Sequence, residues 1–287
     1  MTTMPAPILR YPGAKWRLTP WLHQFTPHVD QVVDVYGGSG AFCLTLPYTP
    51  PHVVYNDLNG DLLNLFTVLR NPITRTQLCE AICFTLWSRA EYLSCVAPDG
   101  SVLLSGEAVE DARRFLVRSW QGQKGVQSSR AGWRNKGSRG VRAGTYEVWQ
   151  QLPDRFAAIA TRLQAAEIEC QPALSIIGRY ATPQTLLYCD PPYVRATAHG
   201  TRQRIYRYEM DIDDHDALLT ALEAHPGPVM LSGYDNDLYA ARLAHWRCER
   251  TAARGESNTR RTECLWLNAA CVERLRATQL TFKEVMT

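Results

Sequence analysis

The sequence predicts a doubly wound α/β fold in which a mostly parallel sheet is closed by an antiparallel hairpin. Short β-branched runs recur along the chain and end in small or acidic residues, as buried parallel strands do where they meet a loop. Helical segments lie between these runs, which is the alternation expected of strand–helix–strand units. With 287 residues, 45% of them hydrophobic, the chain has room for one large domain with an insertion or for two modest domains.

The elements follow in order along the chain. The predicted parallel strands, each with the loop that follows it, lie within residues 31–40, 52–57, 185–193 and 228–234. Helices are predicted over Gly60–Arg70, Glu107–Trp120, Tyr146–Leu163 and Asp213–Ala224, the last with acidic residues in its first turn. Near the end, residues 245–254 and 261–268 flank a polar turn and predict an antiparallel hairpin.

Composition narrows the class of protein. No apolar run approaches the roughly 18 residues needed to span a bilayer, and the amino terminus lacks the apolar stretch of a secretory signal, so we expect an intracellular, cytoplasmic protein. Nine cysteines are an odd number without a CxxC pair, which predicts buried, reduced thiols and no zinc site. We expect no metal.

The charge of the chain is unevenly distributed. Residues 112–146 contain no acid but nine of the 31 basic residues, which leaves 22 basic against 28 acidic residues elsewhere. Such a basic window predicts a face that binds a polyanion. Within it, the stretch Gly122–Gly144 is rich in Gly and Ser and too long for an ordinary connection. Trp120 lies on an apolar helix face and is expected in the core, whereas Trp133 is a candidate stacking or wedge residue.

Two motifs lie where predicted strands end, the edge at which open α/β sheets bind ligands. Glycines in Asp34-Val-Tyr-Gly-Gly-Ser-Gly40 permit a tight turn and let backbone N–H groups approach a ligand closely. Asp57 ends the next strand, where a carboxylate can accept both ribose hydroxyls of an adenosine. Taken singly, the first motif is weak evidence, because an ordinary strand-to-helix turn has the same pattern, and Asp57 is more typical of a helix cap. Together the two motifs favour an adenosyl ligand.

The third motif is Asp190-Pro-Pro-Tyr193, after the apolar strand LLYC. Its prolines stiffen the backbone and remove two N–H donors, which leaves carbonyl acceptors beside a carboxylate and an aromatic ring. Asp190 and the Pro191 carbonyl can each accept one hydrogen of an exocyclic amino group while Tyr193 stacks on the ring. The motif therefore predicts a site for a planar base that bears an amino group.

These motifs resemble those of the Dam-type DNA adenine-N6 methyltransferases, over nearly the whole chain. The segment Arg10–Lys15 is similar to the family's amino-terminal box, with Lys15 in the cationic position and Tyr11 in place of Trp. Residues 34–40 resemble the family's glycine motif, although Val35 and Tyr36 depart from it. Asp190–Tyr193 matches the family's catalytic tetrapeptide at all four positions, and the order of the motifs resembles the family's alpha arrangement.

The resemblance implies a seven-stranded methyltransferase sheet with an inserted, mostly helical DNA-recognition region. It implies a catalytic domain at 1–71 and 151–287 and a target-recognition region at 72–150. It further implies that a base flipped out of duplex DNA receives a methyl group on adenine N6 directly from S-adenosylmethionine. The implied catalytic residues are Asp190, Pro191, Pro192 and Tyr193, and the implied cofactor residues are Tyr11, Lys15, Asp34, Gly38, Gly40, Asp57 and Asp190.

Double-stranded DNA is accordingly the expected partner of the basic window. The residues expected to contact it are Arg118, Lys124, Arg130, Trp133, Arg134, Lys136, Arg139 and Arg142. From residues 168–173, where Pro172 interrupts the family pattern, we expect backbone and apolar contacts to the cofactor's adenine. The predicted protein is monomeric or weakly dimeric, bacterial or phage-encoded, and suited to restriction–modification.

Alternative functions remain open at this point. Cytosine-N4 methylation uses the same amine chemistry, and a non-catalytic DNA-binding protein or reader of methyl marks could use the same fold. Cytosine-C5 methylation is disfavoured, because it requires a thiolate, ordinarily in a Pro-Cys dipeptide, and no cysteine here follows a proline.

Overall fold

The computed structural model describes residues 5–123, 132–135, 145–193, 207–254 and 260–285. The chain divides into two compact units, each described here by itself. Unit 1 comprises Met1–Trp16, Asn59–Ala165 and Gly200–Glu209. Unit 2 comprises Arg17–Leu58, Ala166–His199 and Met210–Thr287.

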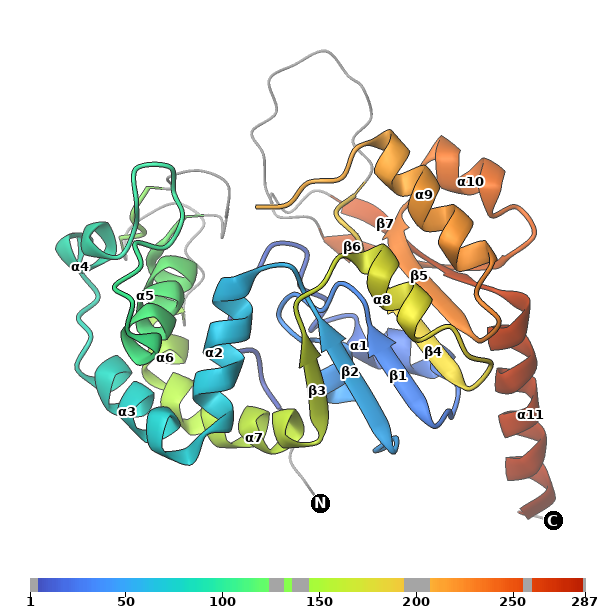
Figure 1. Ribbon diagram of the computed structural model, residues 1–287, viewed down its shortest axis with the longest axis horizontal. Coiled ribbons are helices and arrows are strands. Elements are labelled where there is room, and N and C mark those ends of the chain that lie inside the picture. The colour runs from blue at the N-terminus through green and yellow to red at the C-terminus, as the bar shows by residue number, and fades with distance from the viewer. Residues whose placement is uncertain (1–4, 124–131, 136–144, 194–206, 255–259, 286–287) are drawn as a thin grey trace. The chain divides into compact units, whose positions relative to one another are not determined.

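Unit 2 contains a seven-stranded sheet in the order β3-β2-β1-β4-β5-β7-β6 (Figure 1). Its strands are β1 (Gln31–Asp34), β2 (His52–Asn56), β3 (Ala166–Glu169), β4 (Thr185–Cys189), β5 (Val229–Tyr234), β6 (Arg247–Arg254) and β7 (Arg260–Leu267). The first five strands of that order are parallel, and β7 is antiparallel to both of its neighbours. The predicted fold class, four parallel strands and closing hairpin are confirmed.

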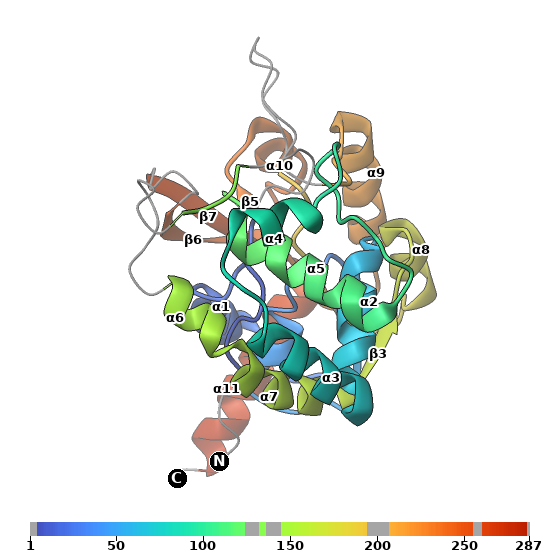
Figure 2. The ribbon, with the colours of Figure 1, turned by 90° about the vertical axis from the view of Figure 1, so that its left-hand side faces the viewer.

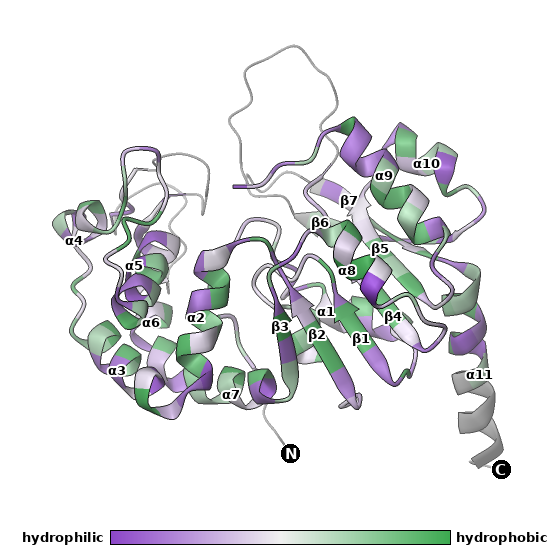
Figure 3. Ribbon diagram, in the orientation of Figure 1, coloured by the Kyte–Doolittle hydropathy of each residue, from purple (hydrophilic) through white to green (hydrophobic). Residues whose placement is uncertain are grey.

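The sheet of unit 2 is covered on both faces, as a parallel sheet must be. On one face Val33, Leu187 and Leu231 pack with side chains of α8 (Ala173–Arg179), α9 (Ile212–Glu223) and α10 (Asp237–Arg242). Their sequence neighbours Val32, Leu186 and Met230 face the opposite side of the sheet. There they pack with side chains of, or directly next to, α1 (Thr19–Leu22), η1 (His23–Phe25), η2 (Cys43–Thr45) and α11 (Ala269–Val285). Figure 3 shows hydrophobic residues along β1 and β5 and a mixture of hydrophobic and hydrophilic residues along α9.

The described part of unit 1 is mostly helical (Figure 2). It contains α2 (Gly60–Arg70), α3 (Pro72–Cys83), α4 (Arg89–Ser94), α5 (Ala108–Gln121), α6 (Thr145–Gln150) and α7 (Leu152–Gln164). Asn59, Asn71 and Ser88 cap α2, α3 and α4 by accepting backbone N–H bonds with their side chains. The predicted target-recognition region, 72–150, falls inside unit 1, which also includes α2 and α7.

One predicted helix is wrong as a single element. Residues 146–163 form α6 and α7 with a break at Gln151. Pro153 lies in the first turn of α7, where its missing N–H costs nothing, whereas within a continuous helix its ring would clash with the preceding turn. Trp120 on α5 is 5% exposed and donates to the Ile8 carbonyl, which confirms its place in a core.

Among the described residues, no helix is long and apolar enough to span a membrane. All nine cysteines are described and are free thiols. Five of them, Cys43, Cys95, Cys189, Cys264 and Cys271, are buried, and Cys83 is exposed.

Candidate active site

Three carboxylates lie at the ends of three adjacent strands in unit 2. Asp34 ends β1, Asp57 follows β2 and Asp190 follows β4, and the sheet order β2-β1-β4 makes these strands neighbours. Burial raises the pKa of Asp34 to about 7, and repulsion from Asp190 and Asp57 adds to the shift. The three groups therefore share one electrostatic environment at the carboxyl edge of the parallel strands.

The glycine loop after β1 is packed tightly against β2. Gly38 and Gly40 have positive φ angles of 49° and 71°, a conformation that favours glycine. At Gly37 a Cβ atom would lie 2.1 Å from a ring carbon of Tyr55, which excludes any side chain unless that ring moves. The Tyr55 hydroxyl donates to the Gly38 carbonyl at 2.7 Å, so β2 fixes the course of the loop.

Asp57 joins this loop to the end of β2. Its Oδ2 accepts the Gly38 N–H at 2.9 Å, and its own N–H is directed to the Glu169 carbonyl of β3. Asn56, beside it, exchanges two hydrogen bonds with the backbone of Gln171, at 2.9 and 3.1 Å. The segment after β3 is thus tied to the two motifs that were expected to bind an adenosyl group, through its backbone rather than through side chains.

Asp34 has an unsatisfied acceptor. The residue is 1% exposed, and its Oδ2 accepts the Cys43 N–H at 3.3 Å. Its Oδ1 is buried and has no hydrogen-bond partner among the described residues. A buried carboxylate oxygen without a donor is costly, so the site is suited to a cationic N–H donor brought by a ligand.

Asp190 is held by a residue that the sequence analysis missed. The buried Ser232 hydroxyl donates to Asp190 Oδ1 at 2.9 Å and lies 3.1 Å from the Tyr188 hydroxyl. Ser232 comes from the middle of β5, the strand beside β4. The available signal was a hydroxyl inside the apolar run VMLSGY, because a buried hydroxyl needs a partner.

A pocket adjoins the tetrapeptide in unit 2. The Tyr193 ring stacks on Tyr234 with 4.1 Å between centroids and 27° between planes. The pocket is lined by Pro191, Tyr193, Ser232, Gly233, Tyr234, Asp235, Asn236 and Tyr239. Pro191 and Tyr193 of the tetrapeptide thus line the same pocket as Ser232, whose hydroxyl donates to Asp190.

The two remaining candidate cofactor residues belong to unit 1. Lys15 is 5% exposed, and its Nζ donates to the Gly13 carbonyl at 3.2 Å. Gly13 has a φ angle of 71°, so the turn before Lys15 depends on glycine. Tyr11 lies in the same turn, where its carbonyl accepts the Ala14 N–H.

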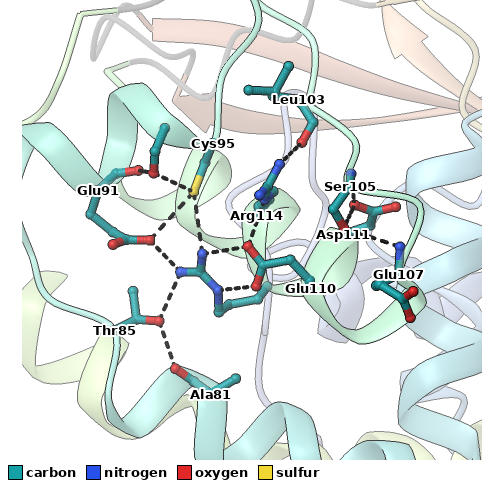
Figure 4. Close-up of polar contacts among 12 residues, drawn as sticks. Ala81, Thr85, Glu91, Cys95, Leu103, Ser105, Glu107, Glu110, Asp111 and Arg114 are labelled. Atoms are coloured by element: carbon teal, nitrogen blue, oxygen red, sulfur yellow. Dashed lines mark hydrogen bonds and ion pairs between the residues drawn. The ribbon is translucent and has the colours of Figure 1, made fainter.

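Some arginines of the basic window, residues 112–146, form ion pairs and hydrogen bonds within unit 1. Arg113 binds Glu110 and Glu91 and donates to Thr85, while Arg114 pairs with Glu110 at 2.7 Å (Figure 4). These bonds tie α4 and α5 to each other and to the segment that follows α3. Hydrogen bonds from the two arginines lower the pKa of Glu110 to about 2.

Arg118 and Arg134 do not fit the expected contact with DNA. They are 7% and 5% exposed, and their guanidinium groups donate to the carbonyls of Gly100 and Gly122 respectively. Trp133 is half-buried, donates to Gln121 and carries the Arg89 guanidinium 5.4 Å from its ring centroid. Outside the described residues lie the other candidates, Lys124, Arg130, Lys136, Arg139 and Arg142.

No metal site is found in the described part of the chain, where no group of three or more His, Cys, Asp or Glu residues could hold an ion.

Comparison with known proteins agrees with this geometry. Residues 11–249 match the family described as D12 class N6 adenine-specific DNA methyltransferase. A DNA adenine methylase of Haemophilus influenzae is 25% identical over 190 residues, which are 65% of this chain and 63% of that protein. One from Serratia marcescens is 22% identical over 239 residues, 80% of this chain and 84% of that protein. The chain therefore spans less than two thirds of the Haemophilus relative's length.

Proposed function

Because the chain belongs to the D12 class of N6 adenine-specific DNA methyltransferases, we propose that it transfers a methyl group from S-adenosylmethionine to N6 of adenine in duplex DNA. The observation that carries the proposal is the Asp190–Tyr193 tetrapeptide at the end of β4, with Asp190 fastened by Ser232 and Tyr193 beside a pocket.

The residues of unit 2 fit the cofactor. The Asp34 Oδ1 atom, which has no donor, suits the ammonium of the methionine part of the cofactor, and Asp57 suits the ribose hydroxyls. Because Gly38 and Gly40 carry no side chains, the backbone of their loop can come close to the cofactor. Tyr11 and Lys15 are assigned from the family resemblance. When bound, S-adenosylmethionine supplies a methyl group on a sulfonium ion, which is strongly electrophilic.

The chain's own residues act on the amine. The lone pair of adenine N6 is delocalised into the purine ring, so the nitrogen is a poor nucleophile. Hydrogen bonds from N6 to Asp190 and to the Pro191 carbonyl favour a more tetrahedral nitrogen and stabilise the positive charge that develops on it. Pro192 stiffens the turn, and Tyr193 stacks on the ring. A base within a duplex cannot reach this pocket, so flipping is part of the proposal.

DNA recognition is assigned to residues 72–150. Of the basic residues proposed there, Lys124, Arg130, Lys136, Arg139 and Arg142 keep their assignment to the phosphate backbone. Arg118 and Arg134 are instead assigned to the internal packing of unit 1. We propose that the protein acts as a monomer or weak dimer in the cytoplasm, where its DNA substrate lies.

The test is transfer of a labelled methyl group from S-adenosylmethionine to unmethylated duplex DNA, followed by nucleoside analysis. The expected product is N6-methyladenine. N4-methylcytosine as the product would show that the same chemistry acts on the amino group of cytosine, and it would contradict the assignment to adenine. Binding of DNA without any transfer would identify a reader and contradict the proposal.

The affinity for S-adenosylmethionine should depend on pH through Asp34. With a pKa of about 7, Asp34 is mostly protonated at pH 6 and must lose its proton to pair with an ammonium. Affinity is therefore expected to rise about tenfold per pH unit from pH 5.5 towards 7 and then to level. Calorimetry in buffers of different ionisation enthalpy should show the released proton, and Asp34→Asn should flatten the profile.

The raised pKa of Asp34 also predicts how the stability of the cofactor-free protein depends on pH. A carboxyl whose pKa is raised on folding stabilises the fold at low pH, and that contribution is lost as the pH rises from about 4 through 7. Asp34→Asn should remove this loss.

For the affinity prediction, a wild-type affinity for S-adenosylmethionine that does not change between pH 5.5 and 7 would contradict the assignment of Asp34.

A further inference from the structure

The β6–β7 hairpin of unit 2 extends beyond the carboxyl edge of the parallel strands. β5 ends at Tyr234, which lies opposite Glu263 of β7. The hairpin continues past that point for three residue pairs, Thr262–Ala252, Arg261–Ala253 and Arg260–Arg254. At roughly 3.4 Å per residue the overhang is about 10 Å long. It stands at the edge of the sheet where β4 delivers the Asp190–Tyr193 tetrapeptide.

This overhang is basic in an otherwise acidic body. Residues 250–261 contain four arginines and one acid. Arg250 and Arg261 are exposed, unlike Arg118 and Arg134, which donate to carbonyls inside unit 1. By sequence, these four arginines give this part of the chain a net positive charge of the kind that attracts a polyanion.

Arg261 connects this patch to the candidate active site. Tyr234 is paired with Glu263, so Arg261, two residues before Glu263, lies on the same face of the sheet as Tyr234. Its guanidinium carbon is 5.2 Å from the Tyr234 ring centroid, and the Tyr234 ring stacks on Tyr193 at 4.1 Å. The positive charge therefore stands one aromatic ring away from the tyrosine of the tetrapeptide.

We propose that the overhang, defined as residues 252–254 and 260–262, binds the phosphate backbone of the DNA strand that carries the target adenine, with Arg261 nearest the catalytic pocket. The inference rests on the proposed function, because it takes the pocket beside Tyr193 as the place of the flipped base. A flipped base remains attached to its sugar and phosphates, so the backbone on either side of it must pass close to the pocket. Arginine presents planar N–H donors that match phosphate oxygens.

The test compares the salt dependence of DNA binding in Arg261→Gln and Arg261→Lys. Binding of an unmethylated duplex is followed by fluorescence anisotropy over a range of salt concentrations. We expect Arg261→Gln to weaken binding several-fold and to reduce the slope of log K against log salt by roughly one unit. Arg261→Lys keeps the charge and should keep most of the slope, and neither variant should change the affinity for S-adenosylmethionine.

The matched control is Arg247→Gln, on β6 at the opposite end of the same hairpin. Arg247 pairs with Leu267, its side chain is 48% exposed, and it forms an ion pair with Glu249 at 2.7 Å. It should leave both affinity and slope unchanged. Equal losses in Arg247→Gln and Arg261→Gln would show an effect of bulk charge and overturn the proposal.

A second outcome would also overturn it. If Arg261→Gln lowers methyl transfer while DNA affinity and salt slope stay at the wild-type values, Arg261 acts only by supporting the Tyr234 and Tyr193 rings. Failure of the proposed function is seen separately, as absence of methyl transfer by the wild-type protein, and it leaves the slope measurement intact.

Discussion

Asp190→Ala is expected to abolish methyl transfer while DNA binding persists and cofactor binding persists largely. The carboxylate is assigned to the charge that develops on N6, and loss of one such group costs on the order of a hundredfold or more in rate. Single-turnover transfer measures the rate, and anisotropy and calorimetry measure the two affinities. Because Asp190 also lies near Asp34, a modest change in cofactor affinity is compatible with this assignment.

Ser232→Ala gives the graded comparison. It removes the hydrogen bond to Asp190 Oδ1 and leaves the carboxylate in place, so we expect a loss of about tenfold in rate, as for one hydrogen bond of about 1 kcal/mol or slightly more. A thermal unfolding curve checks that the buried substitution leaves the fold intact.

For the first of these two variants, an Asp190→Ala protein that methylates at nearly the wild-type rate would contradict the mechanism.

Asp57→Ala should weaken S-adenosylmethionine binding by about 1.5–3 kcal/mol, or roughly 10- to 150-fold, as expected for loss of a charge-assisted hydrogen-bonding group. The substitution removes the acceptor assigned to the ribose. It also releases the Gly38 N–H, which Asp57 holds at 2.9 Å, and so loosens the glycine loop. Calorimetry at fixed pH measures the change.

Asp57→Asn separates the two effects. Its amide oxygen can still accept the Gly38 N–H, so the loop should stay in place, while the negative charge is lost. We expect an affinity between those of Asp57→Ala and the wild type. An unchanged affinity in Asp57→Ala would remove Asp57 from the cofactor site.

The sheet was predictable because its strands carry strong local signals. Residues 31–34 and 185–189 are apolar runs that end at motif residues, and the boundaries Gly60–Arg70 of α2 follow from apolar periodicity. β3, with the sequence AEIE, was not predicted. It is four residues long and lies at the edge of the sheet, so it alternates in burial and lacks the apolar run of a central strand.

The roles of the basic residues could not be read from charge alone. The basic window begins at residue 112 and therefore omits Glu110, which lies one helical turn from Arg113 and Arg114 and forms ion pairs with both. It also cannot distinguish an exposed arginine from Arg118, whose donors are used inside unit 1. Ser232 and Tyr234 escaped notice for a related reason, since their partners lie about 40 residues earlier in the chain.

The strand order has a consequence for how the protein is made. β1 is an interior strand of the sheet, but its two neighbours are synthesised at very different times. His52 of β2 follows Gln31 closely along the chain, whereas Thr185 of β4 is separated from Gln31 by 154 residues. On the ribosome, one edge of β1 must therefore wait while residues 59–165 are synthesised. The described part of these residues forms the helices α2 to α7, and helical proteins fold quickly. We expect a nascent chain stopped after residue 165 to show protease-resistant helices in the part of unit 1 already made and an unprotected β1–β2 pair. Completion of β4 should then protect both strands together.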